Sequence, residues 1–292
     1  MTTTTTTTVA QPRSLSVWPC AQTTAQHQRA GRYDPASFRH PAKMLPELAR
    51  RIIDAYTQPG QLVVDPMGGI GTTAVEAAGL GRRGIVVELE PRWAAVARAN
   101  LRTVLTPSQR RLAEVRVGDA RQLTTVLADM RGTVDAVVTS PPYACSVAMI
   151  DRDAWDAGGD LCAKDTLNYS SDRRNVGHAR GASYAAEMTA IYAECCTVLR
   201  PGGLLITVTK NMRDRGRLID LVGVTVALAE AAGFEHCEHV VALLAAVRRD
   251  GLLPRPSFWQ RLQVGAARSR GEPICHVGHE DVLVFRRRAP QE

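Results

Sequence analysis

The chain has 292 residues, of which 45% are hydrophobic, 22% are charged and 5% are aromatic, and its formal net charge is +7. These values predict a globular protein with one large α/β domain, or a core domain with an appended module. No segment approaches the roughly 20 consecutive apolar residues that span a bilayer, so we expect no membrane partner. Seven cysteines without an export signal indicate reduced thiols and a cytoplasmic location, and the basic excess is compatible with a polyanionic partner.

The first half of the chain alternates between predicted helices and strands. Residues 1–37 are rich in Thr, Gln and Arg, and we expect them to form a disordered or extended tail. Apolar residues between Leu48 and Tyr56 then recur at helical spacing until Pro59-Gly60. The elements that follow are expected to be strand Gln61–Asp65, helix Thr72–Leu80, strand Gly84–Leu89, helix Arg92–Leu105, strand Ala113–Val117 and strand Val134–Thr139.

The second half begins with an irregular stretch, residues 144–183, rich in Asp, Arg, Gly, Ser and Asn. The later elements are expected to be helix Tyr184–Leu199, strand Leu204–Thr209, helix Leu218–Ala232, strand His239–Val247 and strand Asp281–Arg286. Strands that alternate with helices predict an α/β fold with a doubly wound, mostly parallel, seven-stranded sheet and helices on both faces. We expect this single domain to occupy residues 38–292.

A glycine-rich turn, VVDPMGGIGTT at Val63–Thr73, follows the first strand and precedes a helix. Glycines let backbone amides approach a ligand, and the start of the helix offers free N–H groups. NAD binding is the obvious competing interpretation of such a turn. However, the spacing is G-G-x-G and not the G-x-G-x-x-G of dinucleotide-binding proteins.

Three acidic residues stand at the ends of three successive strands: Asp65, Glu88 and Asp119. Asp65 inside the turn would repel a pyrophosphate but would hold a cation, such as the amino group of a methionine moiety. Glu88 is placed to accept hydrogen bonds from ribose hydroxyls, and Asp119 from an adenine amino group. This set fits a sulfonium nucleoside without phosphates better than a dinucleotide. The alternative is that the three acids only cap turns.

The segment TSPPY, Thr139–Tyr143, follows the fourth strand and so lies where open α/β sheets bind ligands. The amino group on a nucleic-acid base is conjugated with the ring, which makes its nitrogen a poor nucleophile. The Ser140 hydroxyl and the Pro141 carbonyl supply two acceptors that pull this nitrogen toward tetrahedral geometry. Prolines stiffen the loop, and Tyr143 is placed to stack on a base rotated out of its helix. The alternative is an ordinary Pro-Pro surface turn.

Together these segments resemble the DNA N4-cytosine/N6-adenine methyltransferase family. The resemblance rests on HPAKM, DPMGGIGTT, VVELEPRW, TSPPY, LRPGGLLITVTKN and HEDVLVFRR, and covers residues 38–211 and 279–287. It implies a Rossmann-like class I methyltransferase fold and S-adenosylmethionine as the cofactor. The implied catalytic residues are Ser140, Pro141, Pro142 and Tyr143. The implied cofactor-binding residues are His40, Pro41, Lys43, Met44, Asp65, Met67, Gly68, Gly69, Gly71, Thr72, Glu88, Leu89, Asp119 and Ala120.

The resemblance also bears on the substrate. Serine at the first position of the SPPY motif, here Ser140, is commoner among N4-cytosine enzymes, whereas aspartate is usual for N6-adenine enzymes. We therefore expect a DNA methyltransferase that favours N4 of cytosine, with a cognate restriction nuclease as a candidate partner. The alternatives are an RNA base methyltransferase, a non-catalytic nucleic-acid-binding relative, and a small-molecule N-methyltransferase.

Two segments are candidates for target recognition, residues 144–183 and residues 247–271. Both are rich in arginine, and the second also carries Phe258-Trp259. Arginines beside aromatic residues suit phosphate and base contacts, although a solvated basic surface is an equal alternative. The candidate nucleic-acid-binding residues are Arg173, Arg174, Arg248, Arg249, Arg255 and Arg261. We expect no metal site, because the spacing of the Cys and His residues at 236–239 and 275–279 is not that of a zinc finger.

Overall fold

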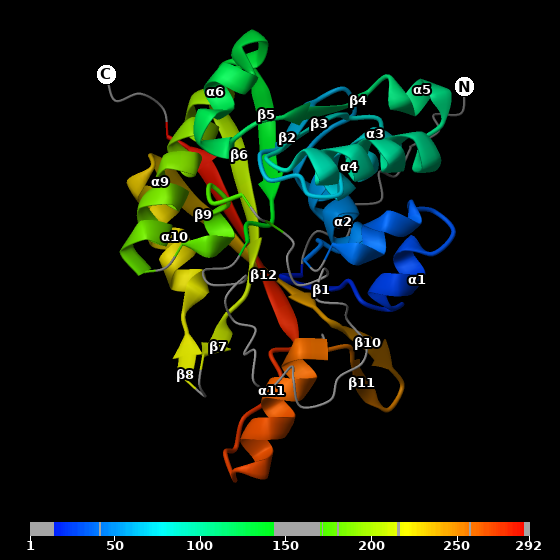
Figure 1. Ribbon diagram of the computed structural model, residues 1–292, viewed down its shortest axis with the longest axis vertical. Coiled ribbons are helices and arrows are strands. Elements are labelled where there is room, and N and C mark those ends of the chain that lie inside the picture. The colour runs from blue at the N-terminus through cyan, green and yellow to red at the C-terminus, as the bar shows by residue number, and fades with distance from the viewer. Residues whose placement is uncertain are drawn as a thin grey trace, which may run out of the picture.

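The body of the protein is a twisted eight-stranded sheet covered by helices on both faces (Figure 1). The computed structural model describes residues 15–40, 42–142, 170, 172–179, 181–214, 217–256 and 258–288. The strand order is β1-β9-β12-β6-β5-β2-β3-β4, and every pair is parallel except those that β12 makes with β6 and β9. The strands are β1 Val17–Pro19, β2 Leu62–Asp65, β3 Arg83–Glu88, β4 Ala113–Val117, β5 Val134–Thr139, β6 Leu199–Thr209, β9 Phe234–Leu243 and β12 His279–Arg287. The predicted doubly wound, mostly parallel α/β fold is confirmed.

The helices form two layers, one on each face of this sheet (Figure 1). One layer holds α2 Pro46–Tyr56, α3 Thr72–Gly79 and α4 Pro91–Val104, with the short α5 Pro107–Arg110 beside them. The other holds α6 Leu123–Val126, α9 Gly181–Val198 and α10 Leu221–Ala231. The 3-10 helices of the described residues are η1 Pro35–Arg39, η2 Ala120–Gln122, η3 Ala128–Met130 and η4 Val176–His178. Among the described residues, no helix has both the length and the apolar character needed to cross a membrane.

The central strands are apolar at consecutive positions because both of their faces are covered. Val63 and Val64 of β2 are neighbours and both are fully buried, yet they belong to two different core clusters. Val63 packs with Leu48 and Ile52 of α2, whereas Val64 lies in the cluster that contains Tyr192 of α9. Burying one such aliphatic side chain contributes about 1.5–3 kcal/mol. The apolar runs are continuous because helices cover both faces of each central strand.

The strand order reverses between β2 and β5. From β2 the chain proceeds outward through β3 to β4, whereas β5 and β6 lie on the other side of β2. Such a reversal opens a crevice beyond the carboxyl ends of the two strands, which is where ligands bind in open α/β sheets. The glycine turn follows β2 and the Ser140 loop follows β5, so both predicted motifs meet at this crevice.

The prediction that residues 1–37 form a tail is wrong for residues 15–37. Here β1 pairs with β9, α1 (Ala25–Arg29) is capped by the Thr24 hydroxyl, and η1 (Pro35–Arg39) leads into the domain. The composition of residues 15–37 is polar, which led to the prediction of a tail. The segment is nevertheless folded, because its buried polar groups form hydrogen bonds with the rest of the domain. Arg29 is 1% exposed and donates to the Met44 carbonyl, and the Tyr33 hydroxyl bonds to Glu76. Strand β1 also raises the strand number from the predicted seven to eight.

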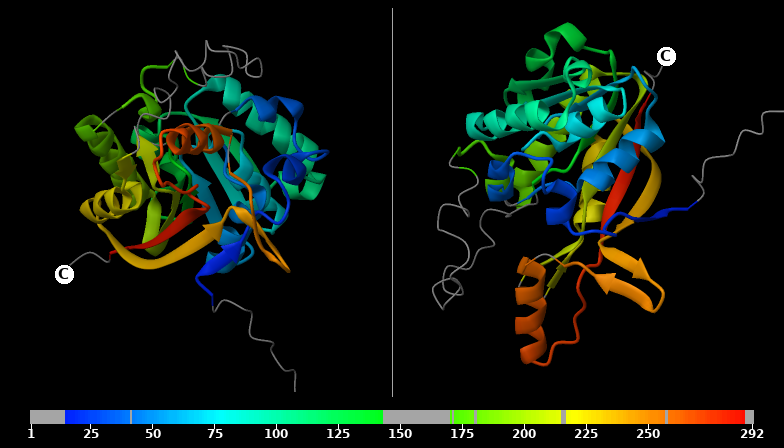
Figure 2. Two further views of the ribbon diagram at one scale, coloured as in Figure 1. Left: turned by 90° about the horizontal axis from the view of Figure 1, so that it is seen from below. Right: turned by 90° about the vertical axis from the view of Figure 1, so that its right-hand side faces the viewer.

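Two further predictions about the second half need correction. The predicted strand His239–Val247 divides at a bend at residue 244 into β9 and β10 (Ala245–Arg248), and β10 forms a hairpin with β11 (Gly251–Pro254). The predicted helix Leu218–Ala232 begins only at residue 221, because Leu218 belongs to a small hairpin, β7 Met212–Asp214 with β8 Arg217–Ile219. The β10–β11 hairpin and helix α11 (Phe258–Ser269) extend from one end of the sheet (Figure 2).

Candidate cofactor and acceptor site

A pocket of about 950 Å³ lies at the reversal of the strand order. This volume is at the upper end of the roughly 300–1,000 Å³ typical of small-molecule sites. Most of the residues predicted from the sequence line it: His40, Lys43, Met44, Asp65, Met67, Gly68, Gly69, Thr72, Glu88, Leu89, Asp119, Ala120, Ser140, Pro141, Pro142, Arg174, Arg255 and Arg261.

Some predicted residues lie elsewhere. Gly71 does not line the pocket, and Arg173 lines a separate hollow of about 400 Å³. Arg248 and Arg249 lie on or beside the β10–β11 hairpin and line neither of these hollows. Pro41 and Tyr143 are outside the described residues, and so is most of the segment 144–183.

The glycine turn is shaped by close contacts with the next strand and helix. A Cβ atom on Gly68 would lie 2.5 Å from the Cβ of Val86, so only glycine fits there. Gly69 and Gly71 have φ of +52° and +81°, in the left-handed region that glycine adopts without strain. Gly71 caps α3, and a Cβ there would lie 3.0 Å from the Cβ of Ala97. Its role in the turn is therefore steric.

Asp65 ends β2 and is 4% exposed. Its Oδ1 accepts a hydrogen bond from the Met67 N–H at 3.1 Å, and its Oδ2 accepts one from the Thr73 hydroxyl at 2.7 Å. Burial raises the pKa of the Asp65 carboxyl, and these hydrogen bonds oppose the rise. The side chain is thus oriented at the pocket wall, where a ligand cation would stabilise its ionised form.

Glu88 ends β3 beside the glycine turn. Its Oε2 accepts from the Gly69 N–H at 2.6 Å and its Oε1 accepts from the Glu90 N–H at 2.8 Å. Burial raises the pKa of Glu88 to about 7, despite these two hydrogen bonds. Each oxygen keeps a further lone pair for a ligand hydroxyl. The role of Glu88 at a ribose stays a prediction.

The segment before α2 closes the pocket against the glycine turn. The His40 ring meets the Trp93 ring edge-on, with centroids 4.6 Å apart, and a Cβ on Gly69 would lie 3.5 Å from His40 Nε2. Burial lowers the pKa of His40 to about 3, so this ring is neutral near pH 7. Lys43 donates to the His40 carbonyl, and burial lowers its pKa to about 8.

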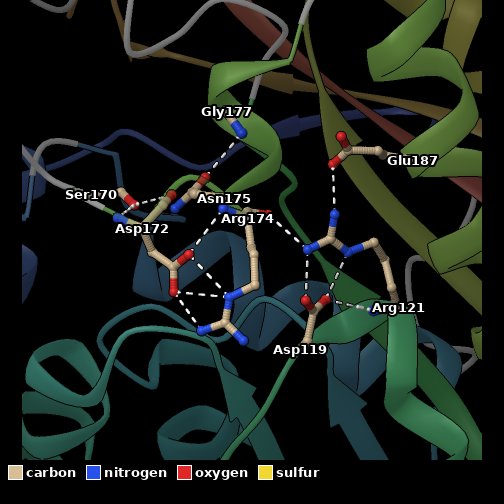
Figure 3. Close-up of polar contacts among 8 residues, drawn as sticks. All are labelled: Asp119, Arg121, Ser170, Asp172, Arg174, Asn175, Gly177 and Glu187. Carbon is tan, nitrogen blue, oxygen red and sulfur yellow. Dashed lines mark hydrogen bonds and ion pairs between the residues drawn. The ribbon is translucent and has the colours of Figure 1, made fainter.

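Asp119 follows β4, and its carboxylate is held by Arg121 (Figure 3). Arg121 Nη2 lies 2.6 Å from Asp119 Oδ2, while Asp119 Oδ1 accepts from the backbone and Nε of Arg121. Burial favours a higher pKa for Asp119, but the Arg121 hydrogen bonds outweigh it and lower the pKa. One lone pair on Oδ2 is left for a ligand amino group.

A segment after the Ser140 loop, residues 172–179, contributes Arg174, Asn175 and Val176 to the pocket wall. Arg121 donates from Nη2 to the Arg174 carbonyl at 3.0 Å and from Nη1 to Glu187 of α9 at 3.1 Å (Figure 3). Arg174 itself pairs with Asp172 at 2.6 Å. The sequence did not reveal Arg121 or Glu187, because their pairing depends on bringing residues 66 positions apart into contact.

The Ser140 loop begins where β5 ends. Ser140, Pro141 and Pro142 line the same pocket as Asp65, and the Pro142 carbonyl accepts from the Tyr184 hydroxyl at 3.3 Å. Tyr184 lies on α9 and is 6% exposed, so it ties the loop to the core. Two prolines restrict the backbone between that anchor and Ser140.

The pocket is also lined by charged residues from three further segments. These are Arg29, Lys210 and Glu280. Sequence patterns did not indicate Arg29, Lys210 or Glu280 as site residues. Arg29 belongs to the segment predicted to be a tail, while Lys210 and Glu280 stand at the ends of strands whose neighbours only the fold defines.

Two of the candidate nucleic-acid-binding arginines contact the N-terminal segment. Arg255 donates from Nε to the Ala21 carbonyl at 3.0 Å, and Arg248 donates from Nη1 to Gln22 Oε1 at 3.1 Å. These contacts join the β10–β11 hairpin to residues that follow β1. Arg249 and Arg261 are exposed, and the side chains of Phe258 and Trp259 lie outside the described part of the chain.

The chain is similar to known methyltransferases over part of its length. Residues 5–98 match the family described as "DNA methylase". A tRNA (guanine(10)-N2)-dimethyltransferase of Methanocaldococcus jannaschii is 33% identical over 111 residues, and the type II methyltransferase M2.DpnII of Streptococcus pneumoniae is 41% identical over 63 residues. These stretches cover 37% and 22% of this chain, and 31% and 24% of the two relatives.

The predicted resemblance to DNA amino-methyltransferases is confirmed. The strand order and the two helix layers confirm the predicted Rossmann-like arrangement, and the match to methylases supports S-adenosylmethionine as the expected cofactor. A methyltransferase structure from Methanosarcina mazei is 14% identical with a TM-score of 0.46, over 81% of this chain and 97% of that one. Among the described residues, no group of three or more His, Cys, Asp and Glu side chains is placed to hold a metal ion.

Proposed function

We propose that this protein transfers a methyl group from S-adenosylmethionine to an exocyclic amino group of a base in DNA, with N4 of cytosine favoured over N6 of adenine. The observation that supports this most is that Ser140 and the acids Asp65, Glu88 and Asp119 line a single pocket. A cofactor held by the acids would therefore lie beside an amino group held by the Ser140 loop.

Each of these pocket residues has its own proposed role in the reaction. S-adenosylmethionine, when bound, supplies an electrophilic methyl group on a sulfonium centre. Asp65 and Glu88 would orient it through its amino group and its ribose, and neutral His40 would form the wall beside the glycine turn. The Ser140 hydroxyl and the Pro141 carbonyl would accept the two amino hydrogens and align the nitrogen lone pair. Holding two reactants in line is worth on the order of 7–11 kcal/mol, and the product nitrogen loses its proton to solvent.

DNA is the favoured acceptor because M2.DpnII and the DNA methylase family match the chain, and because of the net charge of +7. RNA is the alternative, which the match to the tRNA dimethyltransferase favours. A companion restriction nuclease is expected only if the acceptor is DNA.

Transfer of labelled methyl groups to DNA and to RNA, followed by digestion to nucleosides, distinguishes a DNA acceptor from an RNA acceptor. N4-methylcytosine in DNA is the expected product, and label confined to RNA would contradict the proposal.

The Ser140→Ala variant tests the catalytic assignment. Loss of a hydrogen bond that strengthens in the transition state should lower the turnover number at least about 100-fold. Binding of S-adenosylmethionine, measured by calorimetry, should not change, because the Ser140 hydroxyl is proposed to bind the acceptor amino group and not the cofactor. Unchanged turnover would remove Ser140 from the reaction.

A further inference from the structure

Arg29 is a buried cation in the wall of the pocket. It is the last residue of α1 and is 1% exposed, yet it is among the residues that line the pocket. Its Nη1 donates to the Ala25 carbonyl at 3.2 Å, its Nη2 donates to the Met44 carbonyl, and its Cζ lies 5.8 Å from the centroid of the Tyr33 ring. All three partners are uncharged, whereas an arginine buried to this extent is usually paired with an anion.

The charge of Arg29 is not balanced by an ion pair. Burial lowers the pKa of Arg29, and the negative charges of Glu76 and Glu280 only partly oppose this. Both acids lie closer to other cations, since Glu76 Oε1 is 3.2 Å from Arg32 Nη2 and Glu280 Oε1 is 4.0 Å from Lys210 Nζ. In addition, Arg29 Nε is buried and has no hydrogen-bond partner within the part of the chain that the structure describes. A buried charge without an anion is costly, and an anion bound in the pocket would offset that cost.

Lys43 adds a second cation to the same wall. Both cations are attached to one short segment, because Lys43 donates to the His40 carbonyl and Arg29 donates to the Met44 carbonyl. Burial and the charge of Arg29 lower the pKa of Lys43 to about 8, so the two cations are close enough to repel each other. Lys43 forms no ion pair with any acid that the structure describes. Two like charges in one wall favour a negatively charged ligand group beside them.

This wall faces the end of the pocket where Asp65 stands. His40, at the start of the segment, lies against the glycine turn that follows Asp65, since a Cβ on Gly69 would be 3.5 Å from His40 Nε2. In S-adenosylmethionine the amino group and the carboxylate of the methionine moiety are bonded to the same carbon atom. If Asp65 binds the amino group, as proposed, the carboxylate lies beside it and needs a cationic partner. A guanidinium and an ammonium group both form charge-assisted hydrogen bonds with a carboxylate.

Other cations are less suited to this carboxylate. Arg121, Arg174 and Lys210 also line the pocket, but each already lies within 4.0 Å of a protein carboxylate. A phosphate group of the acceptor is the other anion that Arg29 and Lys43 would attract. It is disfavoured, because Arg249 and Arg261 are exposed and offer phosphates a site at the surface, whereas Arg29 is buried.

We propose that Arg29 and Lys43 form a cationic subsite that binds the carboxylate of the methionine moiety of S-adenosylmethionine. This inference rests on the cofactor named in the proposed function and is independent of the acceptor. It gives the folded N-terminal segment a role, because α1 brings Arg29 to the methionine end of the cofactor. The subsite complements Asp65, so that each charge of the amino acid group meets a side chain of opposite charge.

Decarboxylated S-adenosylmethionine tests this subsite, because it keeps the sulfonium and the amino group and lacks only the carboxylate. Calorimetry at pH 7 gives the Kd of both compounds. Wild-type protein should bind the decarboxylated compound on the order of 10- to 100-fold more weakly, as expected for hydrogen bonds to a charged group. In Arg29→Gln, the affinity for S-adenosylmethionine should fall about tenfold. The affinity of this variant for the decarboxylated compound should stay the same or rise, because a cation near a more cationic ligand has been removed.

Two further variants make the test independent of the stability of Arg29→Gln. Lys43→Gln removes the second cation from a half-buried side chain, and it should also reduce the ratio of the two Kd values. It carries the test if Arg29→Gln does not fold. Arg82→Gln is the matched control, because Arg82 is also buried and donates to two backbone carbonyls, but does not line the pocket. Its ratio should equal that of the wild-type protein.

Three outcomes would overturn the inference. Equal Kd values for the two compounds in wild-type protein would show that no subsite for the carboxylate exists. A wild-type ratio in both Arg29→Gln and Lys43→Gln would show that these residues serve only stability. If the ratio is unchanged and Arg29→Gln instead weakens binding of an oligonucleotide in the absence of cofactor, the anion is a phosphate of the acceptor.

The proposed function fails in a different way. Wild-type protein that binds S-adenosylmethionine with the expected ratio but methylates neither DNA nor RNA would contradict the proposed function and leave the subsite in place. Wild-type protein that does not bind S-adenosylmethionine would contradict both.

Discussion

Gly68 shows how little room the turn leaves between β2 and β3. The Gly68→Ala variant would place a methyl group 2.5 Å from the Cβ of Val86, which belongs to a buried strand. We expect a loss of about 1–3 kcal/mol in the free energy of unfolding, as for overpacked cores. Urea denaturation measures it.

Gly79→Ala is the control for this substitution, because a Cβ at Gly79 would meet nothing within 4 Å. Its unfolding free energy should change by no more than about 0.5 kcal/mol, apart from a small gain in helix propensity. Equal losses in both variants would show that the effect at Gly68 is not steric.

We predict that Glu88 makes the affinity for S-adenosylmethionine depend on pH. Its pKa is raised by burial from 4.5 to about 7, so its contribution to stability falls as the pH rises through that interval. A ribose hydroxyl needs the ionised form as acceptor. The Kd for S-adenosylmethionine should therefore be about tenfold weaker at pH 6 than at pH 8.

Calorimetry over this pH range with the Glu88→Gln variant isolates the effect. The variant should bind more weakly at pH 8 and lose the Glu88 part of the pH dependence. Any residual dependence would belong to other pocket groups with a shifted pKa, which include Asp65, Lys43 and Glu280. The same slope in both proteins would exclude Glu88 from cofactor binding.

At the scale of elements, Arg121 joins β4, the segment 172–179 and α9. Replacing it with Met removes the hydrogen bonds to the Arg174 carbonyl and to Glu187. Amide hydrogen exchange in residues 172–179 should become at least about fivefold faster, which corresponds to about 1 kcal/mol. Cofactor affinity should fall as Asp119 loses its orientation.

Arg116→Met is the matched control, since Arg116 also pairs with two acids, Glu114 and Asp129, but does not line the pocket. It should leave exchange in residues 172–179 unchanged. Equal acceleration in both variants would indicate a general loss of stability and not a local tether.

Helices and strands with a strong apolar pattern could be predicted from the sequence. Short strands that form only because a neighbouring strand is available to pair with them could not. Strands β2, β3 and β5 appear at the predicted places because both of their faces are buried, which leaves continuous apolar runs. By contrast, β1 has only three residues, and its place depends on the free edge of β9. The β10–β11 hairpin likewise depends on a bend at residue 244 that no periodicity announces.

At the scale of the whole molecule, the arginines of residues 247–271 separate into two groups. Arg249 and Arg261 are exposed, whereas Arg255 donates to the backbone of Ala21 and Gln22. The double variant Arg249→Gln, Arg261→Gln should weaken DNA binding and reduce the slope of log K against log salt by about 1.8, or 0.9 for each lost phosphate contact. Fluorescence anisotropy at several salt concentrations measures it.

Arg255→Gln should act differently. It should lower the unfolding free energy by on the order of 1 kcal/mol through the lost hydrogen bonds, with a smaller effect on the salt slope. If Arg255→Gln alone changed the slope as much as the double variant, the DNA surface would include the junction with the N-terminal segment.

The sequence by itself determined which residues gather at the pocket. The acids at 65, 88 and 119, the glycine turn and the Ser140 loop each stand at or just after the end of a strand, and parallel strands bring their carboxyl ends to one edge. The tertiary structure decided the rest. That Arg121 holds Asp119, that residues 15–37 are folded, and that Lys210 and Glu280 line the pocket depend on which strands become neighbours. Strand neighbours follow from the packing of the whole chain and leave no local pattern in the sequence.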